Sequence, residues 1–332
     1  MKEIFSIVLV IIGALVGAGF ASGQEIFSFF YLYGKNGMYG IIIMGILMGI
    51  LIYKSLKIIY KNDIYNYEDF LGLYIKNPKI KKTISIIVNI LLLISFYIMV
   101  AGFGAYFEQE IGINKIVGSI ILDFLCVIIF FLNVKGVLKA SNFIVPFLII
   151  IIIFIGIQNI FEIRQIKISQ IKNNWLLSTI IYNSYNFILL IPVLISLKKQ
   201  ITREKNIKYI SIISSLIILT LSMIIYFLLI RGNIKEIQNQ EMPVVYIISN
   251  YFYNYKKIYS FIILASIFTT AISVGIGFIQ NIMCEEISYP HIILFMCITS
   301  LIVSNIGFSK LVNLVYPIFG CVGIVQMIII FL

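Results

Sequence analysis

Charged side chains are scarce in this sequence. Only 12% of its 332 residues are Asp, Glu, Lys or Arg, and 61% are hydrophobic, whereas charged residues make up about 25% of an ordinary soluble domain. A soluble fold of this length needs more polar surface than that, so we predict an all-α integral membrane protein. A soluble enzyme, a nucleic-acid-binding domain and a disulfide-stapled secreted scaffold are excluded. The net charge of +11 is attributed to basic residues beside membrane spans, and no nucleic-acid partner is expected.

Histidine and cysteine are scarce as well. The single histidine, His291, opens an apolar segment, and the four cysteines lie in or beside apolar runs without C-x-x-C spacing. A disulfide framework, a haem site or a metalloprotease site therefore lacks its ligands. No ATP-binding motif of the form G-x-x-x-x-G-K-[ST] occurs. We expect a protein that is not an enzyme and has no cofactor, with sodium as a candidate coupling ion only.

Long apolar segments dominate the chain. A helix needs roughly 20 apolar residues to cross the hydrocarbon core of a membrane. Ten segments qualify, near residues 4–32, 37–59, 83–107, 114–133, 140–161, 175–196, 207–230, 257–281, 289–307 and 311–331. The polar stretches between them are too short to fold separately. Residues 1–332 are thus predicted to form one transmembrane domain with ten helices.

Lysine and arginine are unevenly distributed between the two sides of these spans. The side that holds the N-terminus carries 15 of them and the opposite side carries 10. Because basic loops face the cytoplasm, the N-terminus is predicted to be cytoplasmic. The first span imitates a signal peptide, with a charged start, an apolar stretch and then small residues. It becomes apolar again at Ile26–Leu32, so we interpret it as a span in two parts.

The ten spans divide into two sets of five, over approximately residues 1–162 and 163–332. An odd number of spans per half makes the second half start on the opposite side of the membrane. Many secondary transporters are built from such inverted repeats, and their binding site is marked by an interrupted span at the same position in both halves. The sequence predicts such interruptions in spans one and six.

In span one, four glycines fall within the eleven residues from Gly13 to Gly23. Each glycine weakens a helix by roughly 1 kcal/mol relative to Ala. A break at this depth is tolerated only where it is buried in protein or lines a wet cavity. The polar residues that follow directly, Ser22, Gln24 and Glu25, mark the same place, since polar groups inside a span are costly and usually functional.

The glycines also have an alternative interpretation, because G-x-x-x-G spacing favours close helix packing. The pairs with this spacing are Gly13 with Gly17, Gly19 with Gly23, and Gly45 with Gly49. Packing alone accounts for the pair in span two. It accounts less well for the pairs in span one, because of the polar residues that follow them.

Span six carries five consecutive polar or amphipathic side chains near its centre: Tyr182, Asn183, Ser184, Tyr185 and Asn186. Asn and Ser compete for backbone hydrogen bonds and loosen a helix. The alternative is an interfacial position, where Tyr is common. Since these residues lie well inside the span, we predict a functional break that faces the substrate.

Span eight carries a stripe of hydroxyl groups. Ser266, Thr269, Thr270 and Ser273 share one helix face because residues at i, i+3 and i+4 are neighbours. Oxygen ligands suit a small hard cation. Alternatively, the hydroxyls bond to carbonyls of their own helix.

Two carboxylates fall inside predicted spans. Glu25 lies about six residues beyond the break, roughly 9 Å along the outer half of span one. It could bind a substrate ammonium, pair with a gate residue or carry a coupled proton, and a structural hydrogen bond is the alternative. Asp123 lies midway along span four, where no Lys or Arg occurs. It is expected to be either protonated or paired across helices.

The opening motif, G-A-x-V-G-A-G-F-A-S-G-Q-E-I followed by Tyr33-Gly34, resembles that of the YkvI-like family of bacterial membrane proteins. That family is similar to the amino acid–polyamine–organocation superfamily, which has the leucine-transporter fold of five-plus-five inverted repeats with helices one and six broken. The resemblance implies a multi-pass protein of the bacterial cytoplasmic membrane.

The resemblance also implies a sodium site between the break in helix one and helix eight. Its ligands would be the carbonyls of Gly13, Val16 and Ser266 and the hydroxyls of Thr269 and Thr270. The substrate would lie beside Gly17, Ala18 and Gly19, facing Tyr182 to Asn186.

The leading hypothesis is a secondary transporter that moves a small polar or zwitterionic solute, for example an amino acid, by alternating access with Na⁺ or H⁺ coupling. The second is a sensor of germination-receptor type, which binds a small molecule with a transporter-like fold and does not transport it. A membrane-embedded enzyme is the least favoured, because no cluster of reactive side chains can be assembled at one depth. The sequence leaves the substrate, the direction of transport and the oligomeric state open.

Overall fold

The computed structural model describes residues 2–162, 170–238, 240, 242–283, 288–304 and 308–331. Six of its helices are long and apolar enough to cross a membrane, judged by length and composition. They are α4 (Lys35–Lys61), α6 (Pro78–Tyr106), α8 (Asn133–Glu162), α9 (Trp175–Ser196), α10 (Glu204–Leu229) and α13 (Lys256–Ile282). Three further helices are α7 (Lys115–Phe131), α14 (Tyr289–Ser304) and α15 (Phe308–Phe331). The chain is therefore an all-helical membrane protein.

The first predicted span is built from several short elements. They are α1 (Lys2–Leu15), α2 (Ala18–Ala21), α3 (Gln24–Ile26) and the π-helix η1 (Phe27–Tyr31). The remaining short elements are α5 (Tyr67–Gly72), η2 (Phe107–Ile111), η3 (Lys198–Gln200), α11 (Ile234–Ile237), α12 (Pro243–Tyr251) and η4 (Tyr253–Tyr255). Helical structure thus lies at all ten predicted segments. The boundary between the two predicted halves, near residue 163, lies outside the described residues, as does the end of the ninth predicted segment at residues 305–307.

Local sequence explains several helix boundaries. The side chain of Asn77 accepts hydrogen bonds from the amides of Lys79 and Ile80, and Pro78 occupies the first turn of α6. Both features favour a helix N-terminus. Asn133 has a positive φ of 56°, a conformation that Asn tolerates better than most residues. It allows the sharp corner between α7 and α8.

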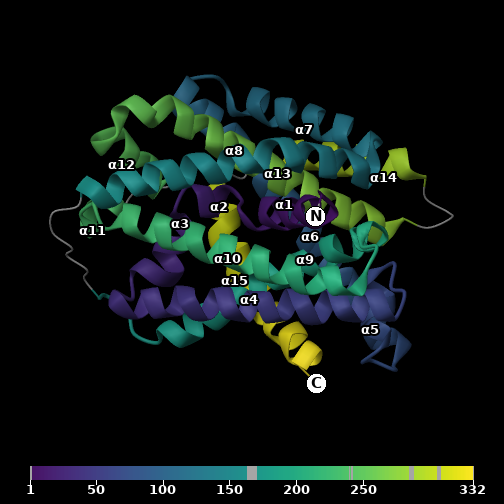
Figure 1. Cartoon of the computed structure of the whole chain (residues 1–332). Coiled ribbons are helices and arrows are strands. Elements are labelled where there is room, and N and C mark those ends of the chain that lie inside the picture. The colour runs from purple at the N-terminus through teal and green to yellow at the C-terminus, as the bar shows by residue number, and fades with distance from the viewer. Residues whose placement is uncertain are drawn as a thin grey trace.

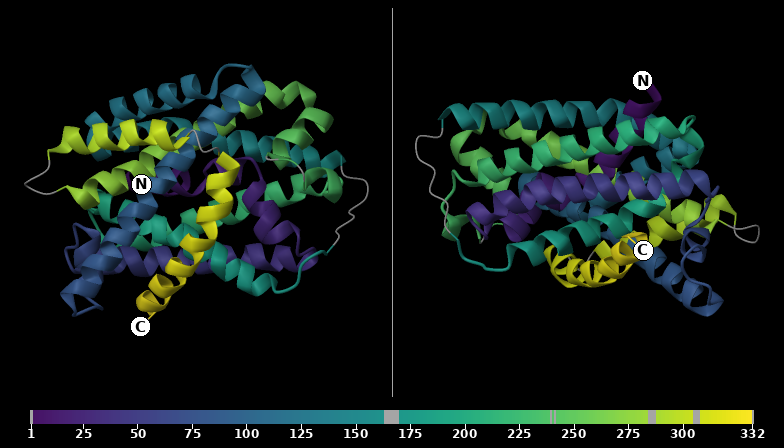
Figure 2. Two further views of the ribbon diagram at one scale, coloured as in Figure 1. Left: turned by 180° about the vertical axis from the view of Figure 1, so that it is seen from behind. Right: turned by 60° about the horizontal axis from the view of Figure 1, so that its bottom comes forward.

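The long helices run side by side, with α4 along one edge of the bundle and α7 and α8 along the opposite edge (Figure 1). α1 is enclosed between them and packs against α8, α9, α10 and α13. α15 crosses the bundle at a steep angle and packs on α9 (Figure 2). This arrangement places the interrupted first segment in the interior of the protein.

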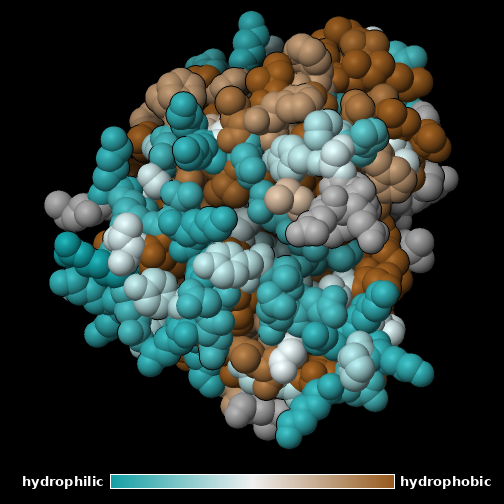
Figure 3. All heavy atoms as spheres, turned by 90° about the vertical axis from the view of Figure 1, so that its right-hand side faces the viewer, coloured by the Kyte–Doolittle hydropathy of each residue, from teal (hydrophilic) through white to brown (hydrophobic). Residues whose placement is uncertain are grey.

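The flanks of the bundle are apolar. Phe124 on α7 is 65% exposed, and Phe143 and Ile150 on α8 are 71% and 63% exposed. Large apolar side chains pointing outward from adjacent helices are typical of a surface that faces lipid. The end of the bundle near α5 is different, because hydrophilic side chains gather over its centre while hydrophobic ones lie along its margin (Figure 3). A polar end and apolar flanks are what a membrane-spanning bundle requires.

The glycine pair of span two serves close packing, as predicted. A Cβ on Gly45 would lie 2.7 Å from the side chain of Leu219, and a Cβ on Gly49 would lie 2.9 Å from that of Ser215. Ser215 Oγ also donates a hydrogen bond to the carbonyl of Gly45 at 2.7 Å. The small residues therefore let side chains of α10 pack directly on the backbone of α4.

The predicted break in span six is wrong. α9 is one continuous α-helix from Trp175 to Ser196, and it contains Pro192 within its length. The polar side chains hydrogen-bond back onto their own helix: Asn183 Nδ2 donates to the carbonyl of Thr179 at 3.0 Å, and Asn186 Nδ2 donates to that of Tyr182 at 3.1 Å. Because these bonds add to the backbone ladder and do not replace it, the helix survives them.

Candidate functional site

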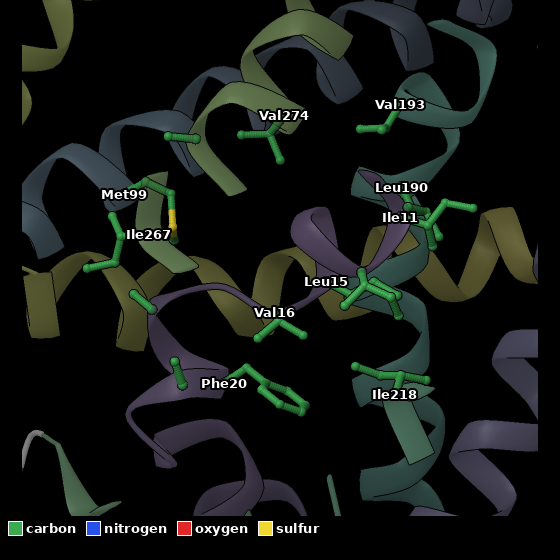
Figure 4. Close-up of a cluster of buried hydrophobic side chains, with 14 of the residues drawn as sticks. Ile11, Leu15, Val16, Phe20, Met99, Leu190, Val193, Ile218, Ile267 and Val274 are labelled. Atoms are coloured by element: carbon green, nitrogen blue, oxygen red, sulfur yellow. The ribbon is translucent and has the colours of Figure 1, made fainter. Parts of the chain in front are cut away.

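The chain leaves helical geometry at the centre of its first segment. α1 ends at Leu15, α2 begins at Ala18, and Gly17 between them is extended, with φ −90° and ψ −166°. In Figure 4 the ribbon narrows at this point, beside Val16, and apolar side chains such as Met99 and Val274 lie around it. Freed backbone groups are therefore held inside protein, which is the condition for an interruption at membrane depth.

The interruption packs directly against the hydroxyl stripe of α13. Thr270 Oγ1 donates a hydrogen bond to the carbonyl of Gly13 at 2.7 Å. A Cβ on Gly13 would lie 3.2 Å from Cβ of Thr269, and a Cβ on Gly17 would lie 3.2 Å from Oγ1 of Thr270. Glycine is thus the residue that allows α1 and α13 to approach this closely.

The other three hydroxyls of the stripe bond within α13. Ser266, Thr269 and Ser273 donate to the carbonyls of Ile263, Ser266 and Thr269, at 2.8, 3.1 and 2.7 Å. These three hydroxyls therefore bond to carbonyls of their own helix, which was the alternative to a cation site. Thr270 differs, because it reaches across to the interrupted segment.

A small cavity lies beside the interruption. Its lining residues are Ala14, Leu15, Gly17, Glu25, Ser95, Met99, Tyr185, Asn186, Leu189, Leu190, Thr270 and Val274. Its volume is about 30 Å³, which suffices for about two water molecules. The cavity in this conformation is therefore too small for a solute such as an amino acid. The lining combines an apolar wall with a few polar groups, as small-molecule sites do.

Glu25 brings a carboxylate to the cavity. It is 6% exposed, and its Oε2 accepts a hydrogen bond from the hydroxyl of Tyr185 on α9. A Cβ on Gly19 would overlap the Glu25 carboxylate, at 2.4 Å from Oε1. Gly23, with φ +81°, turns the chain between α2 and α3. These glycines let the outer part of the first segment fold back so that Glu25 reaches α9.

An aromatic layer covers the same region. The ring centroids of Phe29 and Phe30 on η1 lie 5.4 and 4.9 Å from that of Tyr182 on α9, and Tyr182 lies 5.3 Å from Tyr185. Edge-to-face rings at such distances are a favourable packing arrangement. The layer joins η1 to α9 next to the residues that line the cavity.

The predicted substrate residues separate into two groups. Gly17, Glu25, Tyr185 and Asn186 line the cavity, together with Thr270 from the predicted sodium site. The others lie nearby and do not line it: Ala18, Gly19, Ser22, Gln24, Tyr182, Asn183 and Ser184. Ser184 turns toward α15, where its hydroxyl donates to the carbonyl of Gly320 at 3.0 Å. Ser22 Oγ donates to the carbonyl of Gly19 at 3.2 Å.

The sequence did not predict the part of the cavity wall that α6 and residues 189–190 of α9 contribute. Ser95 and Met99 on α6, with Leu189 and Leu190 on α9, are part of the lining, as are Ala14, Leu15 and Val274. Apolar residues such as Met99 look like any others in a span, so the sequence carries no signal for them. Ser95, a buried hydroxyl in an apolar run, is the one that could have been noticed.

A second, larger cavity of about 620 Å³ opens at the end of the bundle near α5. Its lining residues are Tyr65, Asn66, Asn133, Val134, Lys135, Ile195, Ser196, Lys199, Gln200, Gln280 and Met283. Beside it, Lys198 Nζ lies 2.5 Å from Oδ1 of Asp63 and 3.7 Å from the ring centroid of Tyr65. Burial acts to lower the pKa of Lys198, but its bonds to Asp63 and Tyr65 outweigh that effect, so the pKa lies above its ordinary value.

Comparison with known proteins confirms the predicted resemblance. The chain is 28% identical over 320 residues to the membrane protein YkvI of Bacillus subtilis (strain 168), covering 95% of this chain and 91% of that protein. It is 25% identical over 323 residues to YyaD of the same organism, covering 95% and 92%. No family model matches the chain.

Solved structures of transporters share its fold. MhsT in complex with L-phenylalanine superimposes with a TM-score of 0.67 at 13% identity, covering 98% of this chain and 87% of that chain. A manganese transporter of Eremococcus coleocola gives 0.63 at 14% identity, with 99% and 76% coverage. Mhp1, a nucleobase-cation-symport-1 family transporter, gives 0.62 at 9% identity, with 90% and 70% coverage. The chain therefore has the leucine-transporter fold.

Proposed function

We propose that this protein is a secondary active transporter of the bacterial cytoplasmic membrane that moves a small polar or zwitterionic solute, for example an amino acid, by alternating access. The observation that carries the proposal is the small cavity beside the interruption of the first segment, whose lining includes Glu25, Tyr185, Asn186 and Thr270. The fold shared with solved transporters supports it. Ten spans in two inverted sets of five, with a cytoplasmic N-terminus, belong to the same proposal.

The solute binds between the interruption and α9. The Glu25 carboxylate and the Tyr185 hydroxyl provide the strongest polar contacts, because a charge-assisted hydrogen bond in a dry site is stronger than a neutral one. A solute ammonium group fits this position. The apolar wall around Met99 and Leu190 takes the remainder of the solute.

The coupling ion is Na⁺ or H⁺. For sodium, the ligands are the carbonyls of Gly13, Val16 and Ser266 with the hydroxyls of Thr269 and Thr270. In the present conformation Thr270 points its proton at the carbonyl of Gly13, so both oxygens are committed to each other. Sodium binding then requires this hydroxyl to rotate, so that its lone pairs and the Gly13 carbonyl face the ion together.

The larger cavity is the inner path of the solute. Asn133 and Gln280 line it, and Gln280 Nε2 on α13 donates a hydrogen bond to Asn133 Oδ1 at 2.8 Å. Elsewhere, Glu3 at the start of α1 accepts hydrogen bonds from Thr202 and Asn206.

The test is uptake of radiolabelled L-amino acids into proteoliposomes, with and without a sodium gradient. Thr270→Ala should abolish sodium dependence, whereas Ser273→Ala is the matched control, because the Ser273 hydroxyl bonds only within α13. Unchanged sodium dependence in Thr270→Ala would reject the sodium site. Absence of uptake, together with thermal stabilisation by an amino acid and co-purifying subunits, would favour the sensor instead.

A further inference from the structure

Asp123 lies outside the solute cavity, yet it is a buried carboxyl group in the middle of a membrane helix. It occupies the centre of α7, eight residues from either end, and is 5% exposed. Its neighbour in space is Ser300 on α14, which is separated by 177 positions in the sequence. The proposed transport mechanism makes no use of this group.

The contacts of Ser300 bear on whether the Asp123 carboxyl group carries a proton. Ser300 Oγ lies 2.7 Å from Asp123 Oδ2 and 2.6 Å from the carbonyl oxygen of Cys297. Both distances are those of strong hydrogen bonds, but a serine hydroxyl has only one proton to donate. The carbonyl of Cys297 can only accept. A proton on Asp123 Oδ2 gives each of the two short distances a hydrogen of its own, which an ionised carboxylate cannot do.

The residue beside Ser300 shows the same arrangement with a group that always carries its proton at neutral pH. Tyr97 OH on α6 lies 2.5 Å from Thr299 Oγ1, and Thr299 Oγ1 donates to the carbonyl of Phe295 at 2.6 Å. Because Thr299 donates its own proton to a carbonyl of α14, it accepts a hydrogen bond from Tyr97 on the neighbouring helix. Ser300 repeats this geometry, with Asp123 in the position of the tyrosine.

The electrostatic surroundings agree with a neutral carboxyl group. The titratable groups close enough to feel a charge on Asp123 are the thiols of Cys126 on its own helix and Cys297 on α14, and neither can supply a positive charge. The elements packed against α7 are α6, α8, α13, α14 and the π-helix η2, whose charged residues Glu108 and Glu110 are acidic. Their Lys and His residues all lie in the first third of each helix or at its start: Lys79, Lys81, Lys82, Lys135, Lys139, Lys256, Lys257 and His291. Lys115 begins α7 itself, about 12 Å along the axis from Asp123.

The surroundings of the other carboxyl oxygen of Asp123, Oδ1, also favour a neutral carboxyl group. Oδ1 of Asp123 is buried and has no hydrogen-bond partner among the described residues. An ionised carboxylate distributes its charge over both oxygens, so leaving one of them dry is very costly. In a carboxylic acid with the proton on Oδ2, Oδ1 is an ordinary carbonyl oxygen.

We propose that Asp123 is a proton-binding site: it carries one proton on Oδ2 and donates a hydrogen bond to Ser300, which donates in turn to the carbonyl of Cys297. The chain of two hydrogen bonds fastens α7 to α14. The ligand of the site is a proton, and the site is separate from the solute cavity, on the far side of α6.

Infrared spectroscopy of the purified protein tests this proposal directly. The difference spectrum between the wild type and Asp123→Asn at neutral pH should contain the C=O stretch of a protonated carboxylic acid, which shifts in D₂O. Ser300→Ala should move that band to higher frequency, because the acid loses its acceptor. A difference spectrum that contains only carboxylate bands would overturn the proposal.

Thermal stability gives a second readout that is independent of transport. Asp123→Asn keeps a neutral group that donates to Ser300, so its melting temperature should stay within a few degrees of the wild type. Asp123→Leu leaves Ser300 without that donor and should melt measurably lower. Tyr97→Phe is the matched control, since it removes the equivalent donor to Thr299 without changing any carboxyl band. Equal melting temperatures for Asp123→Asn and Asp123→Leu would contradict the fastening role.

Discussion

The first segment and α9 were both predicted to break, and only the first does so. Between α1 and α2 the residues that leave the helix are Val16 and Gly17, with glycines on either side. In α9 the central residues are polar, and the helix continues through them. Glycine removes helical preference from the backbone itself, whereas Asn and Ser remove it only when their side chains take backbone partners away. In these two segments, polar residues of α9 form part of the cavity wall, and glycines accompany the interruption of the backbone.

The largest effect is expected at the carboxylate beyond the interruption. Glu25→Gln removes the charge that faces the cavity, so solute affinity should fall about tenfold to a hundredfold, corresponding to a charge-assisted hydrogen bond of roughly 1.5–3 kcal/mol. The measurement is the concentration dependence of uptake in proteoliposomes. Unaltered half-saturation in this variant would place the solute elsewhere.

The next largest effect is expected where α15 packs against α9. A Cβ on Gly323 of α15 would lie 2.1 Å from the carbonyl oxygen of Ser184, and neither backbone can yield easily. Gly323→Ala should therefore lower the free energy of unfolding by about 1–3 kcal/mol.

Chemical denaturation in detergent measures that change. The control is Gly72→Ala, where the nearest atom would be 3.7 Å from the new Cβ. If the two variants are equally stable, α9 and α15 are not in close contact at Ser184.

A smaller effect is expected within α9 itself. Asn183 is fully buried, and its Oδ1 has no partner within the described part of the chain. Asn183→Leu has a similar volume and removes this unsatisfied group, so stability should change by no more than about 1 kcal/mol. Uptake should persist. Loss of uptake in a folded Asn183→Leu protein would restore the predicted role of Asn183 in the site.

The smallest effect is expected at Glu3, whose side chain connects the start of α1 to Thr202 and Asn206. Partial burial opposes ionisation of Glu3, but hydrogen bonds from Thr202 and Asn206 outweigh it and hold the pKa of Glu3 below its ordinary value. The resulting stabilisation is complete above the ordinary pKa of a glutamate, about 4.3, and is lost as the pH falls through the lowered value. Thermal melting against pH should therefore be flatter at acid pH in Glu3→Gln. Parallel curves for the two proteins would contradict this.

The sequence was informative where glycine determines the backbone conformation and where a charged residue falls inside an apolar segment. The ten apolar segments, the glycine-rich place in the first one, and the alternatives for Asp123 could all be inferred without coordinates. The partner of Asp123 could not, because Ser300 is one of many hydroxyls in the chain. The continuity of α9 was also hidden, since the destination of an Asn side chain depends on packing. Met99 and Leu190 became wall residues only through the arrangement of helices.

Amide hydrogen exchange with mass spectrometry tests the central claim, that the solute binds at the interruption of the first segment. A thermal-shift screen of L-amino acids first supplies the one that stabilises the protein most, and exchange is then compared with and without it. Amides of Gly17 to Gly19 should exchange fast in the free protein and become protected on binding, while amides of Tyr182 to Asn186 should exchange slowly in both. Protection that appears elsewhere, with no change at Gly17 to Gly19, would contradict the proposed site.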